Sequence, residues 1–598
     1  MQPTRRPLTC SLICALALIA AAPGSARAEA PTAATLSEEI RTLVDRTASQ
    51  WAGMMTPAGD FQNPFPADLA RGHGSFVPPM LAFALHRAGQ RTGNPALVAA
   101  AERAWPRAVD PVRASAFDMV GAAYAYRRLA LSDGRRAQLA AYMSRYGIPQ
   151  NGYSCLVVPS CYGNLRLVDA LAVLSITAAG VSSPDPAARL GDPARARAFA
   201  LWMINERVGQ IVDHRVRMRV GGARLRGSYL SDPGMNPLAY HALSTFMLSE
   251  AVTQLGVEAS RAARRARRET LDTLAALVAP DGDMTYLGRG QGQAWVPGIV
   301  AGALANGARD TAARDPARAA RYLAAARRAV KRLARLHASP RGLQLVPGAA
   351  ARTTADGIDG YAHTVAYNGL AMFGLTAALD ALAAIPAAPI GALPAERRLA
   401  LRDPAASGLG VISNGRVWLA VHRKTTIVRD LRFDAGLLAL KRRTAAGWTD
   451  LLAPRPLAVL APNTGGPALA HRGRLLTPSG YAIRTRGATV TVDGGYRAND
   501  RWVRRMRFRW RLTRTGARLS VSGARRGDRF RMLAFTPAGS GGRGPHALLA
   551  ARALWTFDRR IRGDRLRGYH SGPVERLDGL EAWLSAPESG RFGVTISG

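Results

Sequence analysis

The sequence predicts an α+β multidomain protein, in which an N-terminal (α/α) toroid or incomplete barrel precedes a C-terminal antiparallel β-sandwich. Three observations predict this class. From residue 35 to about 385, apolar residues recur at intervals of three and four, as in helices. After a stretch rich in Pro and Ala at 386–407, the period becomes two, as in strands. The 598 residues, 48% of them hydrophobic, are enough for several packed domains.

Two kinds of predicted helix alternate along the first part of the chain. The helix at 259–278 carries Arg261, Arg264 and Arg268 on one side and should lie outside. The helix at 367–385, with Leu370 and Phe373, has almost no charge and should be buried. This alternation is typical of a toroid with outer and inner helices. The other helices are expected at 37–54, 115–131, 135–146, 165–179, 194–212, 237–255 and 316–337.

The last third of the chain predicts strands. They are expected at 417–420, 426–431, 489–492, 501–512, 517–521 and 530–535. In the clearest one, Met506, Phe508, Trp510 and Leu512 fall on one face and four arginines on the other. We therefore expect an antiparallel sheet with one solvated, basic face.

The N-terminus has the pattern of an export signal. Arg5 and Arg6 precede an apolar run at 8–22, which ends in Ala26-Arg27-Ala28. The expected division is a signal peptide at 1–28, a toroid at 29–385, a linker at 386–407 and a β-sandwich at 408–598. We expect a secreted or periplasmic protein with no lipid anchor and no membrane span after the signal.

Cys155 and Cys161 are the cysteines that remain after removal of the signal. A close pair in an exported protein predicts a disulfide that closes a small loop. Two cysteines give no zinc framework, and no metal or cofactor is expected.

The formal net charge is +40, and only Lys331, Lys424 and Lys441 among the 81 basic residues are lysines. Two explanations of this arginine excess are equally weighted. One is a genome with GC-rich codons, which favour Arg, Ala, Gly and Pro together. The other is a polyanionic partner that a basic surface attracts. The sequence contains no zinc-finger spacing, RNP-like motif or basic-helix heptad, so nucleic acid is not expected. An acidic polysaccharide fits both the charge and the export signal.

The first polar cluster lies where an inner helix is predicted to begin. Asn236 precedes Pro237, a pairing that predicts an N-cap followed by Pro at the first helical position. Tyr240 and His241 follow within two turns. Asn236 could instead act only as a cap, with His241 a core residue.

The second cluster alternates polar side chains with glycines before another uncharged helix. It contains Tyr286, Arg289, Gln291, Gln293 and Trp295. Glycines allow close approach of a ligand, arginine can hold a carboxylate through two hydrogen bonds, and the indole can stack on a sugar ring. The spacing fits no phosphate-binding fingerprint. The alternative is a glycine-rich turn.

The third cluster contains Tyr361, His363 and Tyr367, and on a helix the last two share a face. His363 and Tyr367 could act as general acid and general base, or they could only pack against each other at the start of the helix. Asn164 and Arg166 form a weaker fourth cluster at a helix entrance.

The order of helices and then sheets resembles the exported polysaccharide lyases of the chondroitin AC/hyaluronate lyase and heparinase II/III-like group. The string from Asp356-Gly357 to His363 and Tyr367 is similar to a segment of that group. The string at 288–295 is similar to one in unsaturated glucuronyl hydrolases, which are α/α barrels. The resemblance implies a lyase that cleaves an anionic, uronic-acid-containing polysaccharide by β-elimination.

Such a lyase removes the proton next to the carboxylate and expels the oxygen at C4. Asn236 and Arg289 are the candidates for neutralising the carboxylate. His363 or His241 is the candidate base, and Tyr367 or Tyr240 the candidate acid. The expected substrate-binding residues are Tyr240, Tyr286, Gln291, Gln293, Trp295, Asn164, Arg166 and Tyr361. We expect a monomer.

Two other functions stay open. A glycoside hydrolase on the same fold needs two carboxyl groups across the bond, for which Asp281, Asp283, Asp356 and Asp359 are candidates. A non-catalytic glycan-binding protein would bind the polymer and leave its length unchanged.

Overall fold

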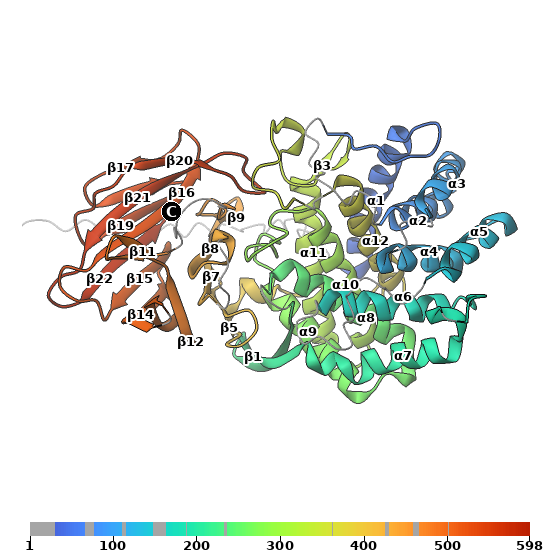
Figure 1. Cartoon of the computed structure of the whole chain (residues 1–598), viewed down its shortest axis with the longest axis horizontal. Helices are drawn as coiled ribbons and strands as arrows, with labels where there is room; N and C mark the ends of the chain where they lie inside the picture. The colour runs from blue at the N-terminus through green and yellow to red at the C-terminus, as the bar shows by residue number, and fades with distance from the viewer. Residues whose placement is uncertain are drawn as a thin grey trace, which may run out of the picture.

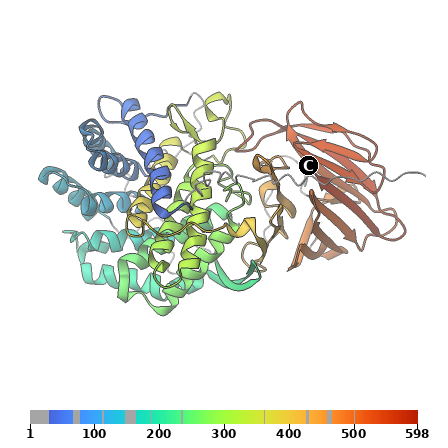
Figure 2. The same cartoon turned by 180° about the vertical axis from the view of Figure 1, so that it is seen from behind.

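The structure is a computed structural model, which describes residues 30–65, 77–110, 115–146, 163–186, 188–232, 236–360, 363–424, 430–457, 466–499 and 501–598. A helical part lies at one end of the molecule and layered β-sheets at the other (Figure 1). The view from behind shows the same division (Figure 2). The predicted α+β multidomain class is confirmed.

The described residues form twelve α-helices, arranged as an inner and an outer set. The inner helices follow one another around a ring, which closes because α12 packs against both α10 and α2. The inner set is α2 (Pro78–Thr92), α4 (Ala116–Arg128), α6 (Gly163–Thr177), α8 (Leu238–Leu255), α10 (Trp295–Thr311) and α12 (Thr364–Leu382). The outer set is α1 (Ala33–Met54), α3 (Pro95–Ala108), α5 (Asp133–Ser144), α7 (Pro193–Asn205), α9 (Arg261–Leu277) and α11 (Pro316–Leu336).

The inner and outer helices differ as the sequence predicts. Helix α9 exposes Arg261, Arg264 and Arg268 and buries its opposite side. Helix α12 is buried along nearly its whole length. Of the described helices, α12 is the one long and apolar enough to cross a membrane, but 94% of its most apolar stretch is buried inside the protein. Helix α12 is therefore a core helix of the ring.

Three antiparallel sheets and one short ribbon contain the described strands. The seven-stranded sheet has the order β2 (Ala223–Leu230), β1 (Val212–Val220), β5 (Arg398–Arg402), β6 (Leu409–Asn414), β7 (Val417–His422), β8 (Gly436–Thr444), β9 (Gly447–Asp450). The five-stranded sheet has the order β11 (Arg474–Leu476), β10 (Ala468–His471), β16 (Arg529–Pro537), β21 (Leu577–Ser585), β20 (Arg565–Tyr569). The eight-stranded sheet has the order β12 (Pro478–Arg486), β13 (Thr489–Ala498), β14 (Arg501–Leu512), β15 (Gly516–Ser522), β22 (Arg591–Ser597), β19 (Ala553–Phe557), β18 (Ala547–Ala550), β17 (Gly542–Arg543). The ribbon pairs β3 (Ala338–Ser339) with β4 (Gly342–Leu343).

The helical part contributes two strands to the first sheet. The hairpin of β1 and β2 lies in sequence between α7 and α8, and β1 pairs with β5. Strand β5 lies within 386–407, the range that the sequence analysis treats as a linker, and it also pairs with β6. Helix α7 ends at Asn205, short of the predicted 212. The two parts of the chain therefore share a sheet at their junction.

Strand β14 has the two faces that its alternation predicts. Met506, Phe508, Trp510 and Leu512 are buried in the core between the sheets. The arginines between them are exposed. The solvated, basic face of this sheet is thus confirmed.

A buried ion cluster also joins the two parts. Lys441 on β8 contacts the carboxylate of Asp281, at 3.0 Å, and that of Asp450. Arg332 on α11 pairs with the same Asp281. Together these cations hold the pKa of the Asp281 carboxyl well below its usual value, against the effect of burial.

We expect Lys441→Met to lower the free energy of unfolding by about 3 kcal/mol, because Asp281 would stay buried with one cation fewer. Lys331→Met is the matched control, since Lys331 is exposed and lies 3.8 Å from Glu39. Chemical denaturation of both variants checks this. Equal midpoints for the two variants would contradict a structural role for the cluster.

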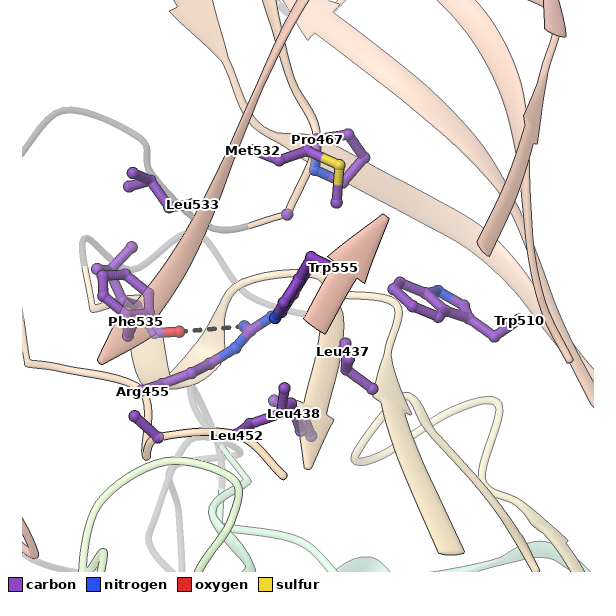
Figure 3. A pocket seen from close by; sticks show the side chains of 13 residues that line it. Leu437, Leu438, Leu452, Arg455, Pro467, Trp510, Met532, Leu533, Phe535 and Trp555 are labelled. Atoms are coloured by element: carbon purple, nitrogen blue, oxygen red, sulfur yellow. Dashed lines mark hydrogen bonds between the residues drawn. The ribbon is translucent and has the colours of Figure 1, made fainter. Parts of the chain in front are cut away.

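A small cavity of about 50 Å³ lies where the three sheets meet (Figure 3). Trp510, Trp555 and Phe535 line it together with the guanidinium of Arg455. Arg455 donates to the carbonyls of Leu431, Asp434 and Ala435. Burial lowers the pKa of Arg455 to about 10, and its carbonyl partners identify it as a structural link between loops.

Candidate functional site

The candidate site lies at the mouth of the helical ring, where the inner helices begin. The loops there pack tightly on the β part of the chain. A Cβ atom on Gly288 would come within 2.4 Å of the Phe433 ring, and one on Gly357 within 2.4 Å of the Ser571 nitrogen. Both glycines also have positive φ, so other residues are excluded sterically and conformationally.

The mouth brings together an arginine and three aromatic side chains from three segments. The guanidinium carbon of Arg289 lies 4.8 Å from the ring centre of Tyr240, on α8. The Trp295 ring, at the start of α10, lies 5.9 Å from Tyr240 and 5.7 Å from Tyr367 on α12. We call Tyr240, Arg289, Trp295 and Tyr367 the mouth cluster. Its members are separated by up to 127 positions in the sequence.

The exposure of the aromatic members differs. Tyr240 is half-buried, whereas Trp295 and Tyr367 are 2% and 3% exposed. Burial raises the pKa of Tyr367 well above its usual value, Tyr240 and Asp359 raise it further, and Arg289 opposes them. Trp295 is therefore a support for the two phenols and not an exposed stacking platform.

Asp359 holds the glycine-rich loop in place. Its carboxylate accepts from the Gly290 backbone nitrogen at 2.9 Å and from Gln293 at 3.3 Å. Gln293 in turn accepts from the Trp295 indole at 2.6 Å. Arg432, from the β part, pairs with Asp359 at 2.9 Å. Gln293 is thus placed behind the site, where it positions Trp295.

Asn236 orders the segment in front of α8 and is not its N-cap. The N-cap is Pro237, and Asn236 has a left-handed φ of 48°. Its side-chain oxygen accepts from the Asp232 nitrogen at 2.8 Å, and its nitrogen donates to the Ala406 carbonyl at 2.9 Å. Asparagine tolerates this conformation, which explains why the expected cap is absent.

Asp232 connects that segment with the mouth cluster. Its carboxylate lies 3.4 Å from the Arg289 guanidinium. Burial raises the pKa of Asp232 to about 6, although Arg289 lowers it. Asp232 holds Arg289 near Tyr240, and it was not among the residues predicted from the sequence.

His241 points away from solvent and is fully buried. Its Nδ1 accepts from the Leu230 nitrogen at 3.1 Å, and its ring stacks on Tyr229 at 4.3 Å. Burial lowers the pKa of His241 to about 3. A neutral, enclosed imidazole of this kind is poorly placed to take a proton from a substrate.

We expect the stability contributed by His241 to be lost in acid. Its pKa is about 3 in the folded chain against 6.5 when exposed, so the unfolded chain binds more protons below pH 6.5. The advantage of the native protein over His241→Gln should therefore shrink by about 2 kcal/mol between pH 6.5 and about pH 5. Unfolding curves of both proteins at several pH values check this. A difference independent of pH would contradict a buried, neutral His241.

His363 is the N-cap of α12, where its Nδ1 faces the Ala366 nitrogen at 3.4 Å. In that arrangement the neutral ring carries its proton on Nε2. Tyr286 is buried elsewhere, with its hydroxyl on the Leu277 carbonyl and its ring against Trp418.

The fourth predicted cluster stands at the entrance of α6. Asn164 and Arg166 are 6% and 4% exposed, and Arg166 lies 3.5 Å from Gln210. Gly163 is close to Ser231, which places Asn164 next to the Asp232 segment. Tyr361, Cys155 and Cys161 lie outside the described residues.

Several buried polar atoms near the ring mouth have no hydrogen-bond partner among the described residues. They are the side-chain oxygens Asn164 Oδ1, Asp232 Oδ1, Gln291 Oε1 and Thr364 Oγ1. Buried polar atoms are normally paired, because an unpaired one costs about 1–3 kcal/mol. Unpartnered oxygens at this end of the inner helices could complete their hydrogen bonds with a polar ligand.

The acidic candidates for hydrolysis are already engaged. Asp281 is bound by Lys441 and Arg332, and Asp283 accepts from the nitrogen and hydroxyl of Thr285 at 2.8 Å. Asp359 is paired as described above, and Asp356 is exposed. Within the ranges that the structure describes, no group of three His, Cys, Asp or Glu side chains is arranged to hold a metal ion.

Arg432 is a site-supporting residue that the sequence analysis missed. It is 3% exposed and lies between Asp430 and Asp359. Nothing in its own surroundings in the sequence marks it, because its partner Asp359 is 73 positions away.

No family model matches the sequence, and no curated protein matches it. Solved structures do. The chondroitin AC lyase of Streptomyces coelicolor A3, solved with chondroitin sulphate, has a TM-score of 0.51 and 14% identity, covering 94% of this chain and 79% of that one.

Two further solved structures are more distant. A Paenibacillus xanthan lyase has a TM-score of 0.49 and 9% identity, covering 94% of this chain and 57% of that one. A heparinase III has a TM-score of 0.43 and 11% identity, covering 93% and 84%. The chain therefore has the fold of chondroitin AC lyase, a helical toroid followed by antiparallel β-sheets.

Proposed function

We propose that the protein is an exported polysaccharide lyase, which cleaves an acidic, uronic-acid-containing polysaccharide by β-elimination. The observation that carries the proposal is the contact between Arg289 and Tyr240, at 4.8 Å, beside Tyr367. It supplies a fixed positive charge and a half-buried phenol in one place. The likeness in fold to a chondroitin AC lyase that was solved with chondroitin sulphate supports the substrate class.

Elimination starts with a proton that is only weakly acidic while the neighbouring carboxylate keeps its charge. In the proposed complex Arg289 binds the uronate carboxylate through its planar fork and spreads that charge. Asn164 is a candidate second donor through its amide nitrogen, since it is 6% exposed and lies near the Asp232 segment. Asn236 positions this segment, because its own amide is engaged by backbone groups.

Tyr240 is the proposed proton-transfer residue. Its deprotonated oxygen takes the proton from the carbon next to the carboxylate and becomes a neutral phenol, the C–O bond at C4 breaks, and a C=C bond forms. The same phenol then gives the proton to the leaving oxygen. The positive charge of Arg289 stabilises the deprotonated form of Tyr240, which exists before the first transfer and is restored by the second. Tyr367, kept protonated by its surroundings, is assigned to positioning Tyr240.

The two histidines take lesser parts in this proposal. His241 supports the start of α8 from the protein interior. His363 caps α12, and its Nε2–H is suited to donating a hydrogen bond rather than taking a proton. Export with removal of residues 1–28, the disulfide of Cys155 with Cys161, and a monomeric state remain predictions.

Incubation with acidic glycans tests the proposal. An eliminase leaves an unsaturated uronate at one new end, which absorbs in the ultraviolet, whereas a hydrolase leaves none. We expect rising absorbance with chondroitin sulphate, alginate or another uronate polymer. New reducing ends without absorbance would favour hydrolysis, and unchanged polymer length despite binding would favour a glycan-binding protein.

A further inference from the structure

The exposed face of the eight-stranded sheet carries a concentration of arginines far from the ring mouth in sequence. We define the basic sheet face as Arg484 and Arg486 on β12, Arg507, Arg509 and Arg511 on β14, and Arg518 on β15. All six are exposed. The buried faces of the same strands form the core between the sheets, so these side chains point to solvent.

The strand register places these arginines close together. Arg511 lies opposite Thr489 on one side and opposite Arg518 on the other, and Arg486 pairs with the same Thr489. Arg509 precedes Arg511 by two residues on the same face of β14, and it lies between Thr491 and Ser520 of the neighbouring strands. Like charges directly opposite each other destabilise a sheet. The Arg511–Arg518 pair is therefore unfavourable unless an anion lies between them.

Few carboxylates compensate this charge. Asp493 pairs with Arg484 and, at 2.7 Å, with Arg507. Within the described residues no ion pair involves Arg486, Arg509, Arg511 or Arg518. Asp558 borders the face, where it accepts from the Gly593 nitrogen at 2.7 Å. A positive potential thus remains over the middle of the face.

An aromatic pair stands at one end of the basic sheet face. Tyr481 is 57% exposed, and its ring meets the edge of Trp502 at 5.7 Å. The guanidinium of Arg497 lies 5.1 Å from the Trp502 ring. Asp493 raises the pKa of Arg507, and Tyr481 raises it by a smaller amount. Tyr481 therefore lies close to Arg507. Exposed aromatic rings beside arginines are suited to sugar rings that carry acidic groups.

A basic groove continues from the other end of the face. It has a volume of about 550 Å³ and is lined by Arg416, Arg442, Arg443 and Arg514, with Thr444 and Thr515. Arg514 lies in the turn between β14 and β15, and this turn separates Arg511 from Arg518. From Trp502 to Leu512 the strand extends for about 34 Å. This length accommodates several sugars of an extended chain.

We propose that the basic sheet face, with Tyr481 at one end and the groove at the other, is a second binding surface for an acidic polysaccharide, separate from the ring mouth. Arginine forks would bind carboxylate or sulphate groups, and Tyr481 a sugar ring. The inference rests on the substrate class of the proposed function and not on its catalytic step. Its role is to retain a long polymer while the ring mouth acts on it.

The test compares two triple variants in the full-length protein, both with Tyr240→Phe so that polymer is not consumed. One carries Arg509→Ser, Arg511→Ser and Arg518→Ser. The matched control carries Arg261→Ser, Arg264→Ser and Arg268→Ser, which removes three exposed arginines from α9. Affinities for chondroitin sulphate and for alginate are measured by titration calorimetry at two salt concentrations.

We expect the sheet-face variant to bind at least one of these polymers about tenfold or more weakly, with a smaller salt dependence, and the control to bind nearly as the parent does. Tyr481→Ala should weaken the same binding by about threefold to tenfold. Equal losses in both triple variants would reduce the effect to net charge and overturn the proposal. Unchanged binding of both polymers would overturn it too, as would a weakening confined to single-stranded DNA, titrated in the same way. A protein that binds through this face but never cleaves would overturn the proposed function and not this inference.

Discussion

Replacing Tyr240 with Phe is expected to lower kcat for cleavage of a uronate polymer by about 10²- to 10⁴-fold, which is the usual contribution of one proton-transfer group. The change removes one oxygen from a half-buried ring and leaves its contacts with Arg289 and Trp295. KM should change little. The rate is followed by ultraviolet absorbance of the unsaturated product.

Tyr126→Phe is the matched control for this variant. Tyr126 is also half-buried on an inner helix, and the guanidinium of Arg136 lies 5.3 Å from its ring. It reproduces the tyrosine–arginine contact away from the ring mouth. We expect full activity in Tyr126→Phe. If Tyr240→Phe is also fully active while both variants are folded, Tyr240 does not transfer the proton.

Replacing Arg289 with Ala is expected to lower kcat/KM by about 10²- to 10³-fold, as for loss of a donor to a developing anion. Arg289→Lys keeps the charge but loses the planar fork, so its activity should lie between those of the alanine variant and the native protein. Asp232 would lose its cation, and its pKa should rise above the present value of about 6.

Arg136→Lys and Arg136→Ala are the controls for the arginine series, because Arg136 contacts the ring of Tyr126 in the same way. Steady-state kinetics on one uronate polymer checks all four variants, two at Arg289 and two at Arg136. An alanine variant at Arg289 with native kcat/KM would contradict its role as the group that neutralises the carboxylate.

The sequence predicts elements whose patterns arise from one-sided burial. In β14, alternate residues face the core and water, and the pattern gave both its bounds and its faces. The contrast between α9 and α12 gave the outer and inner positions in the same way. The hairpin of β1 and β2 also alternates, from Val216 to Val220, but it interrupts a helical region, and no strand is predicted there.

The candidate site was harder to predict than the fold. The inner helices are buried on most of their sides, so helical position alone does not tell an accessible side chain from a buried one. Tyr240 and His241 are adjacent in sequence, yet Tyr240 is half-buried at Arg289 and His241 is enclosed behind Tyr229. The sequence predicts that Trp295 stacks on a sugar ring, but its ring is buried between the phenols of Tyr240 and Tyr367. The support from Arg432 depends on contacts between distant segments.

Cleavage in water labelled with heavy oxygen tests the central claim most directly, with the products weighed by mass spectrometry. Elimination breaks the C–O bond without adding water, so the account predicts products that carry one double bond for each cut and, when reduced at once before the new anomeric hydroxyl exchanges with the solvent, no label. Products that contain one heavy oxygen for each cut, and no double bond, would contradict it.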